Sequence, residues 1–264
     1  MQRISAENGV VFYQFEQWAA LSFLQHGVFT RLGGVSRSPW QTLNVGSTVG
    51  DAPAAVQENH RRIYAALGVP SSQVCTVWQV HGAEVIYAQQ SRSDGRWLAR
   101  ADGIITDRAG LALMMRFADC APILFYDPVH RAVGLAHAGW RGTVAGAGVS
   151  TLRAMQRTFG TRPQDVQAAI GPSIGPQRYQ VGEEVVQAVR EAFGTTEGLI
   201  RRAPDGSAYL DLWTANRRAL KRAGVAQIEL AGLCTASHAD EFYSHRAEAG
   251  RTGRFGVVIA LQEE

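Results

Sequence analysis

Residues 132–143 read AVGLAHAGWRGT, an apolar run that passes directly into a turn containing two glycines. Its first seven residues have the length and composition of a buried β-strand bounded by turn signals. The strand ends near His137, and Trp140 and Arg141 follow in the turn. We expect the glycines to let the backbone approach a substrate closely and to place His137 and Arg141 around one pocket.

Strand-like runs of the same kind recur along the chain and set the fold class. They are VCTVWQV (74–80), EVIYA (84–88), GIITD (103–107), LALMMRF (111–117), PILFYD (122–127), VQAAIG (166–171), IELAG (228–232) and FGVVIAL (255–261). Helices are predicted over 54–67, 143–159, 182–193 and 210–224, with Thr143 as the N-cap of the second. Since strands and helices interleave without a regular βαβ repeat, we predict an α+β fold with mixed sheets. No linker or repeat divides the sequence, so we expect a single domain over residues 1–264.

The segment 30–53, TRLGGVSRSPWQTLNVGSTVGDAP, is rich in glycine, serine, threonine and proline and shows no periodicity. A loop of this length is uncommon in a compact domain unless it has a function. We therefore expect it to form one wall of a pocket whose other wall is made by strand ends.

Composition limits the classes of partner and the compartment. The 26 basic and 23 acidic residues leave a formal charge of +3, too small to indicate a nucleic-acid or membrane partner. The three cysteines, Cys75, Cys120 and Cys234, are odd in number and widely spaced, which argues against a disulfide framework. No apolar stretch approaches the length of about 18 residues that spans a membrane. We expect a cytoplasmic protein without a signal peptide.

Three side chains at the ends of strand-like runs have metal-binding chemistry: His81, Cys120 and His137. Two imidazoles and one thiolate form a zinc ligand set, and three protein ligands leave a fourth position open, as in catalytic sites. Their separations of 39 and 17 residues match no local zinc signature. From the residues alone, two alternatives stay open: a buried cysteine with two hydrogen-bonded histidines, and a nucleophile–base pair of Cys120 and His137.

Arginines beside glycines indicate anion recognition. Arg141 precedes a predicted helix start, and FYSHRAEAGRTGRF (242–255) contributes Arg246, Arg251 and Arg254. A solvated basic loop is the plain alternative. The sequence contains neither G-x-G-x-x-G nor the G-x-x-x-x-G-K-[ST] phosphate loop. Its seven histidines form no His-x-His pair, which argues against a multicopper centre.

A series of motifs resembles the YfiH-like family, also called the laccase-domain or multicopper polyphenol oxidase family. In order, they are TRLGGVS, LNVGSTVGD, WQVHG, ADGIIT, ADCAPI, HAGWRGT, IGPSIGPQRYQVG, DLWTANRRAL and CTASHADEFYSHRAEAGRTGR. The resemblance runs from about residue 27 to residue 261, nearly the whole chain. The ADC motif followed by HAGWRG at this separation is its most specific part.

The resemblance implies a fold in which the sheets are sandwiched by helices, and one zinc ion held by His81, Cys120 and His137, with copper as the alternative metal. It also implies phosphorolysis of purine nucleosides such as adenosine, inosine and 5′-methylthioadenosine, together with adenosine deamination. Editing of peptidoglycan precursors by hydrolysis and oxidation of phenols are the alternative activities. The sequence departs from the family pattern at Phe117, where threonine is frequent, and at Ala247, where a second arginine is common.

The same resemblance assigns roles to four further residues. Arg246 matches a position that the family uses for activity, and we expect Arg246 or Arg141 to position the phosphate that attacks the anomeric carbon. Asn44 and Asp102 are candidates for binding ribose hydroxyls or purine nitrogens. The expected partners are a purine nucleoside and phosphate, with no nucleic acid and no membrane, in a monomer or a small homo-oligomer. A rival interpretation is a non-enzymatic binding protein whose zinc only ties strand ends together.

Overall fold

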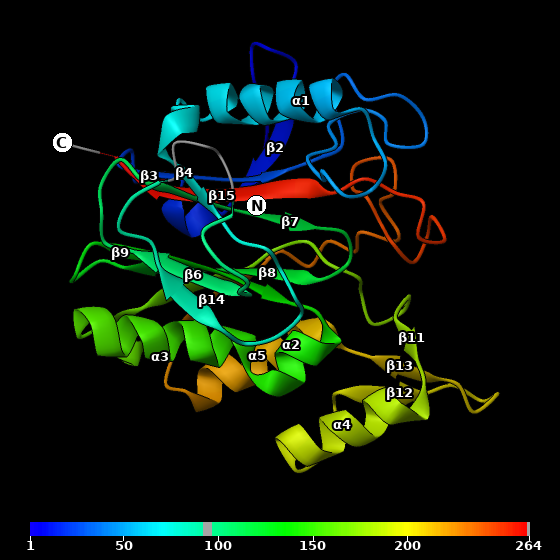
Figure 1. Ribbon diagram of the computed structural model, residues 1–264. Coiled ribbons are helices and arrows are strands. Elements are labelled where there is room, and N and C mark those ends of the chain that lie inside the picture. The colour runs from blue at the N-terminus through cyan, green and yellow to red at the C-terminus, as the bar shows by residue number, and fades with distance from the viewer. Residues whose placement is uncertain (92–96, 263–264) are drawn as a thin grey trace.

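Two six-stranded β-sheets lie face to face in the middle of the molecule (Figure 1). The computed structural model describes residues 1–91 and 97–262. The first sheet has the order β1 (Gln2–Ser5), β2 (Val11–Gln14), β3 (Leu24–Phe29), β15 (Phe255–Leu261), β7 (Ala112–Phe117) and β4 (Val74–Thr76). The second has the order β14 (Gln227–Leu230), β10 (Gln167–Ile170), β8 (Ala121–Asp127), β9 (Ala132–Ala138), β6 (Gly103–Thr106) and β5 (Val85–Tyr87). Both sheets combine parallel and antiparallel pairs, which confirms the predicted mixed topology.

Helices cover the outer face of each sheet, as predicted. Helix α1 (Pro53–Ala66) lies over the first sheet, and α2 (Trp140–Ala145), α3 (Ala147–Phe159) and α5 (Leu212–Arg222) lie over the second (Figure 1). At one edge, α4 (Glu183–Phe193) accompanies a small sheet of β11 (Gln180–Val181), β13 (Ala208–Leu210) and β12 (Ile200–Arg202). Three short 3-10 helices occupy Glu16–Trp18, Ser71–Gln73 and Pro163–Asp165. No helix in residues 1–91 and 97–262 is long and apolar enough to cross a bilayer.

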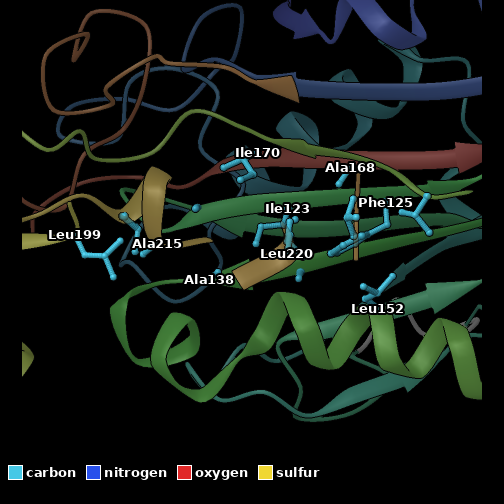
Figure 2. Packing of buried hydrophobic residues seen from close by; sticks show 14 of the residues in the cluster. Ile123, Phe125, Ala138, Leu152, Ala168, Ile170, Leu199, Ala215 and Leu220 are labelled. Carbon is cyan, nitrogen blue, oxygen red and sulfur yellow. The ribbon is translucent and has the colours of Figure 1, made fainter. Parts of the chain in front are cut away.

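The period-2 alternation of the strands builds separate cores on the two faces of each sheet. In β8, Ile123 and Phe125 point toward the helices, where they pack near Leu152 and Leu220 (Figure 2). Their neighbour Leu124 points toward the first sheet instead and joins the core between the two sheets. A third core lies under α1, made of residues such as Phe12, Phe29, Ile63, Leu67, Met114 and Val258. The strands therefore form a continuous, buried stack that can hold side chains at its edge rigidly.

One connection between the two sheets positions part of the candidate site. Strand β7 belongs to the first sheet and β8 to the second, so residues 118–120 carry the chain from one sheet to the other. In β9, His137 follows Val133 and Leu135 on the face that looks toward the first sheet, and its ring lies 5.4 Å from the ring of Phe117 at the end of β7. The crossover and the end of β9 thus meet at the same edge.

The structure corrects the predicted helix over 143–159. Gly146 adopts the left-handed region at φ 80° and divides this segment into α2 and α3. The N-cap of α2 is Gly139, so the prediction of Thr143 as N-cap is wrong. Thr143 lies inside the helix, and its hydroxyl pairs with the buried side chain of Asn216.

Other differences concern short or exposed strands. The predicted strand 74–80 ends at Thr76, after which the chain turns toward His81. Strands β1, β2 and β3 and the small sheet were not predicted. β1 is an exposed edge strand, and the strands of the small sheet have only two or three residues each, so their hydrophobic pattern is weak. Segment 30–52 contains no helix or strand, as expected.

Candidate metal centre

The structure brings His81, Cys120 and His137 into one cluster at the edge of the two sheets. One ligand atom from each of the three residues lies within 4.8 Å of the other two, and the imidazole rings are 4.9 Å apart between centroids. They come from three separate segments, the turn after β4, the β7–β8 crossover and the end of β9. The separations of 39 and 17 residues in the sequence are therefore closed by the sheet topology.

A single buried carboxylate positions both histidines. Asp102 lies directly before β6, and its side chain is fully buried. One of its oxygens accepts a hydrogen bond from Nδ1–H of His137 at 2.8 Å, which leaves Nε2 of this imidazole as the ligand atom. The same carboxylate accepts the backbone N–H groups of Val80, His81 and Gly82 at 2.7–3.1 Å. His81 can therefore adopt φ 62°, a conformation that a non-glycine residue rarely takes without such support.

Cys120 is held by the crossover and by the glycine turn that follows β9. Asp119 precedes it in the left-handed region at φ 84°, and its carboxylate accepts hydrogen bonds from the Thr235 hydroxyl and the Arg246 backbone N–H. A Cβ atom on Gly139 would lie 2.6 Å from the Cys120 Sγ atom. Gly139 has φ −72°, so glycine is required here for space beside the thiol and not for backbone conformation. This contact, and not approach to a substrate, explains the first glycine of HAGWRG.

The cluster strongly shifts the pKa values of its own members. Burial alone would raise the pKa of the Cys120 thiol, but His137 and His81 beside it bring that pKa down to about 6. Burial alone would lower the pKa of His137, but the Cys120 thiolate and the Asp102 carboxylate raise it to about 9. The lowered pKa of Cys120 favours a thiolate at neutral pH, which is the form that binds a metal ion. The raised pKa of His137 favours an imidazolium paired with this thiolate, so His137 would have to release its Nε2 proton to bind a metal ion.

The donor set fits one metal ion that prefers nitrogen and sulfur. Three protein ligands, one of them a histidine whose Nδ1–H donates to the Asp102 carboxylate, are the arrangement of a catalytic zinc site with an open position. The same donors also suit copper, since soft thiolate and imidazole ligands bind both metals. The residues His81, Cys120 and His137 are thus able to hold a metal, and its identity is not fixed by the ligand types.

The cluster opens into a cavity of about 560 Å³. Its lining includes four arginines, Arg116, Arg141, Arg246 and Arg254, against one acidic residue, Asp119. Arg141 and Arg246, both predicted as anion ligands, therefore reach the same space as the three metal-ligand candidates. None of the four arginines forms an ion pair with a carboxylate in the described part of the chain. The cavity consequently carries an excess of positive charge that suits an anionic ligand.

Each of these arginines is anchored by neutral groups. Arg246 donates to the Gln180 carbonyl at 2.6 Å and lies over the Tyr179 ring, 5.3 Å from its centroid. Arg141 lies over the ring of Trp140, and Arg254 donates to the carbonyls of residues 252 and 253. Because carbonyls and rings do not neutralise a guanidinium, the positive charges stay available to a ligand in the cavity.

Asn44 and Asp102 do not line the cavity; both are fully buried behind its walls. Asn44 Oδ1 accepts the backbone N–H groups of Gly46 and Arg254, and its amide donates to Asp51. It therefore joins the early loop to the C-terminal loop that contains Arg254. The structure places both residues where they hold the wall, and direct contact of either with a substrate stays an untested expectation.

Several cavity residues were not predicted. Arg116 lies on β7 two residues before ADC, and as a single charged residue in an apolar strand it was given no role. Trp78 is the first residue of the quoted WQVHG motif but was given no role, and Trp97 lies about twenty residues further on in a stretch without a motif. The C-terminal basic loop gave a usable signal: Arg246 and Arg254 line the cavity, whereas Arg251 is exposed outside it.

Fold and site together define a class of protein: a sandwich of two mixed sheets with a His–Cys–His cluster in an arginine-lined cavity at the edge of the sheets. Residues 25–262 match the family described as multi-copper polyphenol oxidoreductase laccase, and the chain belongs to this family. The sequence resemblance to the YfiH-like family is thereby confirmed.

Relatives of this chain extend over nearly its whole length. A purine nucleoside phosphorylase of Deinococcus radiodurans is 41% identical over 236 residues, 89% of this chain and 88% of that protein. The purine nucleoside phosphorylase YlmD of Geobacillus stearothermophilus is 38% identical over 247 residues, 90% of each chain. The crystal structure of YfiH from Bacillus licheniformis superposes with a TM-score of 0.89 at 32% identity, covering 98% of this chain and 97% of that one.

Proposed function

We propose that the protein is a zinc-dependent purine nucleoside phosphorylase that acts on adenosine, inosine or 5′-methylthioadenosine. One observation carries the proposal: a single cavity is lined by three candidate metal ligands and by four arginines without carboxylate partners. Phosphorolysis needs an anion site next to a site that polarises the nucleoside, and this cavity offers both. The names of the relatives in Deinococcus radiodurans and Geobacillus stearothermophilus support the same reaction.

Phosphate is the ligand that the arginines fit best. Arg116 lies on β7, where burial lowers its pKa to about 10. Its Nη2 donates to the Val77 carbonyl, and its other guanidinium N–H groups form no hydrogen bond within the described residues. Arg254 is also largely buried, and burial lowers its pKa. A dianion between such groups would restore the electrostatic energy that burial costs them, so Arg116 and Arg254 join Arg141 and Arg246 as proposed phosphate ligands.

The reaction itself is a displacement at the anomeric carbon. A phosphate oxygen forms a bond to this carbon while the bond from the carbon to the purine nitrogen breaks. The electron pair of the broken bond leaves with the base, and the proton of hydrogen phosphate ends on the base, so atoms and charge balance. The arginines hold phosphate in line with the anomeric carbon and offset its charge. A zinc ion held by His81, Cys120 and His137 would supply a Lewis acid that polarises a bound oxygen.

Asp102 and Asn44 take positioning roles in this proposal. Asp102 fixes the tautomer of His137 and the turn of His81, so it governs the geometry of the ligands without touching the nucleoside. Asn44 orients Arg254 through the backbone. All three cysteines are free, which supports the expected cytoplasmic, reducing environment.

The proposal is tested by incubating the purified protein with adenosine and with inosine, each with and without phosphate. We expect free adenine and free hypoxanthine to appear only when phosphate is present. Conversion of adenosine to inosine would instead support deamination, and base release without phosphate would indicate a hydrolase. Turnover of a phenol or of a peptidoglycan precursor with no reaction of nucleosides would overturn the proposal.

Site variants decide whether this cavity carries the activity. His81→Ala, Cys120→Ala and His137→Ala are each expected to lose bound zinc, measured by elemental analysis, together with phosphorolysis. Arg254→Ala is expected to raise the KM for phosphate on the order of 10-fold or more, since it removes a charge-assisted contact. Arg251→Ala is the matched control, because Arg251 belongs to the same loop but is exposed outside the cavity. Full activity in all three ligand variants would show that the site is wrongly assigned.

A further inference from the structure

Two exposed tryptophans stand at the cavity, on the side that the proposed phosphorolysis leaves without a role. Trp78 and Trp97 both line the cavity, and each keeps 36% of its surface exposed. Among the described residues only five large hydrophobic side chains are this exposed, and the other three are valines. Large aromatic rings left open to solvent beside a functional cavity indicate a binding surface for an apolar group.

The backbone fixes the two rings next to each other. Trp78 forms a parallel bridge with Arg100, its N–H donates to the Ala99 carbonyl at 2.9 Å, and its own carbonyl accepts the Ala101 N–H at 3.0 Å. The N–H of Leu98, directly after Trp97, donates to the Thr76 carbonyl at 2.9 Å. The ring centroids are 4.3 Å apart at an angle of 78°, an edge-to-face pair. Neither ring therefore has to be ordered when a ligand binds, which lowers the entropic cost of binding.

The position of the pair matches the geometry of a nucleoside. Trp78 lies three residues before His81, so the aromatic pair adjoins the candidate metal centre, and the arginines complete the rest of the cavity lining. A nucleoside awaiting phosphorolysis presents a flat, uncharged base at one end and its reacting carbon at the other. The charged groups suit phosphate, whereas a neutral aromatic ring gains more from stacking on indole faces.

We infer that Trp78 and Trp97 form the subsite that binds the purine base by stacking. This inference rests on the proposed function and names the part of the cavity that selects the base. It also accounts for the exposure of the two rings, since a bound base would cover apolar surface that otherwise faces water. Ribose hydroxyls and phosphate then fall on the polar groups of the cavity.

Direct binding separates this inference from turnover. With selective excitation of tryptophan, inosine added without phosphate is expected to quench tryptophan emission, and this quenching should be lost in a Trp78→Ala, Trp97→Ala double variant. Trp213→Phe is the control, since Trp213 lies on α5 outside the cavity and its loss should leave the quenching intact. Thermal unfolding confirms that each variant is folded, as expected for exposed positions.

Kinetics supply the second readout. Each single alanine variant is expected to raise the KM for inosine roughly 5- to 100-fold with little change in the KM for phosphate, and Trp78→Phe should retain most of the affinity. Unchanged nucleoside affinity in the folded double variant would overturn the inference while leaving phosphorolysis standing. Nucleoside binding that depends on both tryptophans, without phosphorolysis, would keep the subsite and overturn the proposed function. An absence of nucleoside binding in the unmodified protein would overturn both.

Discussion

At the residue scale, the candidate site depends on how tightly Asp102 and Gly139 fit around the metal-ligand candidates. Asp102 accepts four N–H groups, three from the turn that presents His81 and one from the ring of His137. Gly139 allows the turn after β9 to pass within contact of the Cys120 sulfur. The geometry of the cluster is therefore set by two residues that are not themselves candidate metal ligands.

Gly139→Ala is expected to displace the thiol, because the new Cβ would lie 2.6 Å from Sγ, well inside contact distance. Zinc affinity should fall on the order of 10- to 100-fold, as for other changes that misplace metal ligands. The affinity is measured by competition with a chromophoric chelator. Gly82→Ala is the matched control: its Cβ would meet nothing closer than 3.6 Å, so zinc affinity should be nearly unchanged. Equal affinity in the two variants would refute the proposed role of Gly139.

Residue types alone identified the chemistry of His81, Cys120 and His137, and the family resemblance grouped them. Spacing alone did not, because the sheet topology that joins residues 39 and 17 positions apart is a long-range property. For the same reason the place of Arg116 in the cavity could not be predicted, since in the sequence it is one charged residue in an apolar strand. Asp102 was a candidate substrate ligand because of its family position and its hydrogen-bonding capacity, and its sequence neighbours show nothing of its burial. Only the three-dimensional contacts reveal that its oxygens are already occupied.

At the element scale, the irregular segment 30–52 is held in place by a helix rather than by its own secondary structure. Asn59 on α1 is fully buried. Its Oδ1 accepts the Val35 N–H, and its Nδ2 lies within hydrogen-bond distance of Ser36 Oγ and of the carbonyls of Thr42 and Asn44. The Asn59 side chain thus adds to the few backbone hydrogen bonds within the loop, and the loop in turn holds Asn44 against Arg254.

Asn59→Ala should therefore lower both stability and activity. It leaves the buried Asn44 carbonyl without its partner and removes the acceptor of the Val35 N–H, at a cost of about 2–3 kcal/mol in the free energy of unfolding. That free energy is obtained from urea denaturation. Gln57→Ala on the exposed face of the same helix is the control and should change it by less than about 0.5 kcal/mol. A loss in Asn59→Ala no larger than in the control would show that the loop is held by other contacts.

Strongly patterned elements could be predicted, and weakly patterned ones could not. Strands β7, β8, β9 and β15 are continuous apolar runs, and their predicted bounds agree with the structure to within a residue. The helix is divided at Gly146 because this residue has a left-handed φ. Glycine allows that conformation, but its presence in the sequence does not predict it. The strands β11–β13 are too short for any period to be read.

At the scale of the whole molecule, the candidate metal site lies at the edge of the stack, and of its three residues Cys120 packs against a core, as a partly buried residue at the margin of the core between the sheets. The cores beneath the helices and between the sheets are closed by large apolar side chains, each contributing roughly 1.5–3 kcal/mol when fully buried. The fold should therefore survive removal of a metal ion.

Chelation is expected to abolish phosphorolysis while leaving the far-UV circular dichroism and a cooperative thermal transition in place. The transition should move to lower temperature, because a metal that binds only the folded state stabilises it. Activity should return when zinc is added back. Unfolding on chelation would favour the rival in which zinc only ties strand ends together.

Stability in acid depends on His26, a buried histidine that does not belong to the candidate metal site. Burial lowers the pKa of His26 to about 4, and Nε2 of its neutral ring accepts the Phe15 N–H. Between the usual histidine value of about 6.5 and a pKa of about 4, the unfolded chain binds this proton and the folded chain does not. The contribution of His26 to the free energy of unfolding is thus fully present above pH 6.5 and is lost as the pH falls toward 4.

His26→Gln keeps an acceptor for Phe15 and removes the titration. In metal-free protein, we expect the unmodified chain to lose about 3 kcal/mol more than this variant between pH 7 and pH 4. Urea denaturation at a series of pH values measures the difference. Parallel pH profiles for the two proteins would contradict the assigned role of His26.

The most direct measurement of the central claim follows the oxygen atoms of phosphate. Inosine is incubated with the zinc-loaded protein and phosphate labelled with ¹⁸O, and the products are analysed by mass spectrometry. Phosphorolysis in the arginine-lined cavity predicts hypoxanthine and ribose 1-phosphate in equal amounts, with the sugar phosphate retaining every labelled oxygen. Free ribose with unlabelled oxygen from water, or no release of hypoxanthine, would contradict the claim.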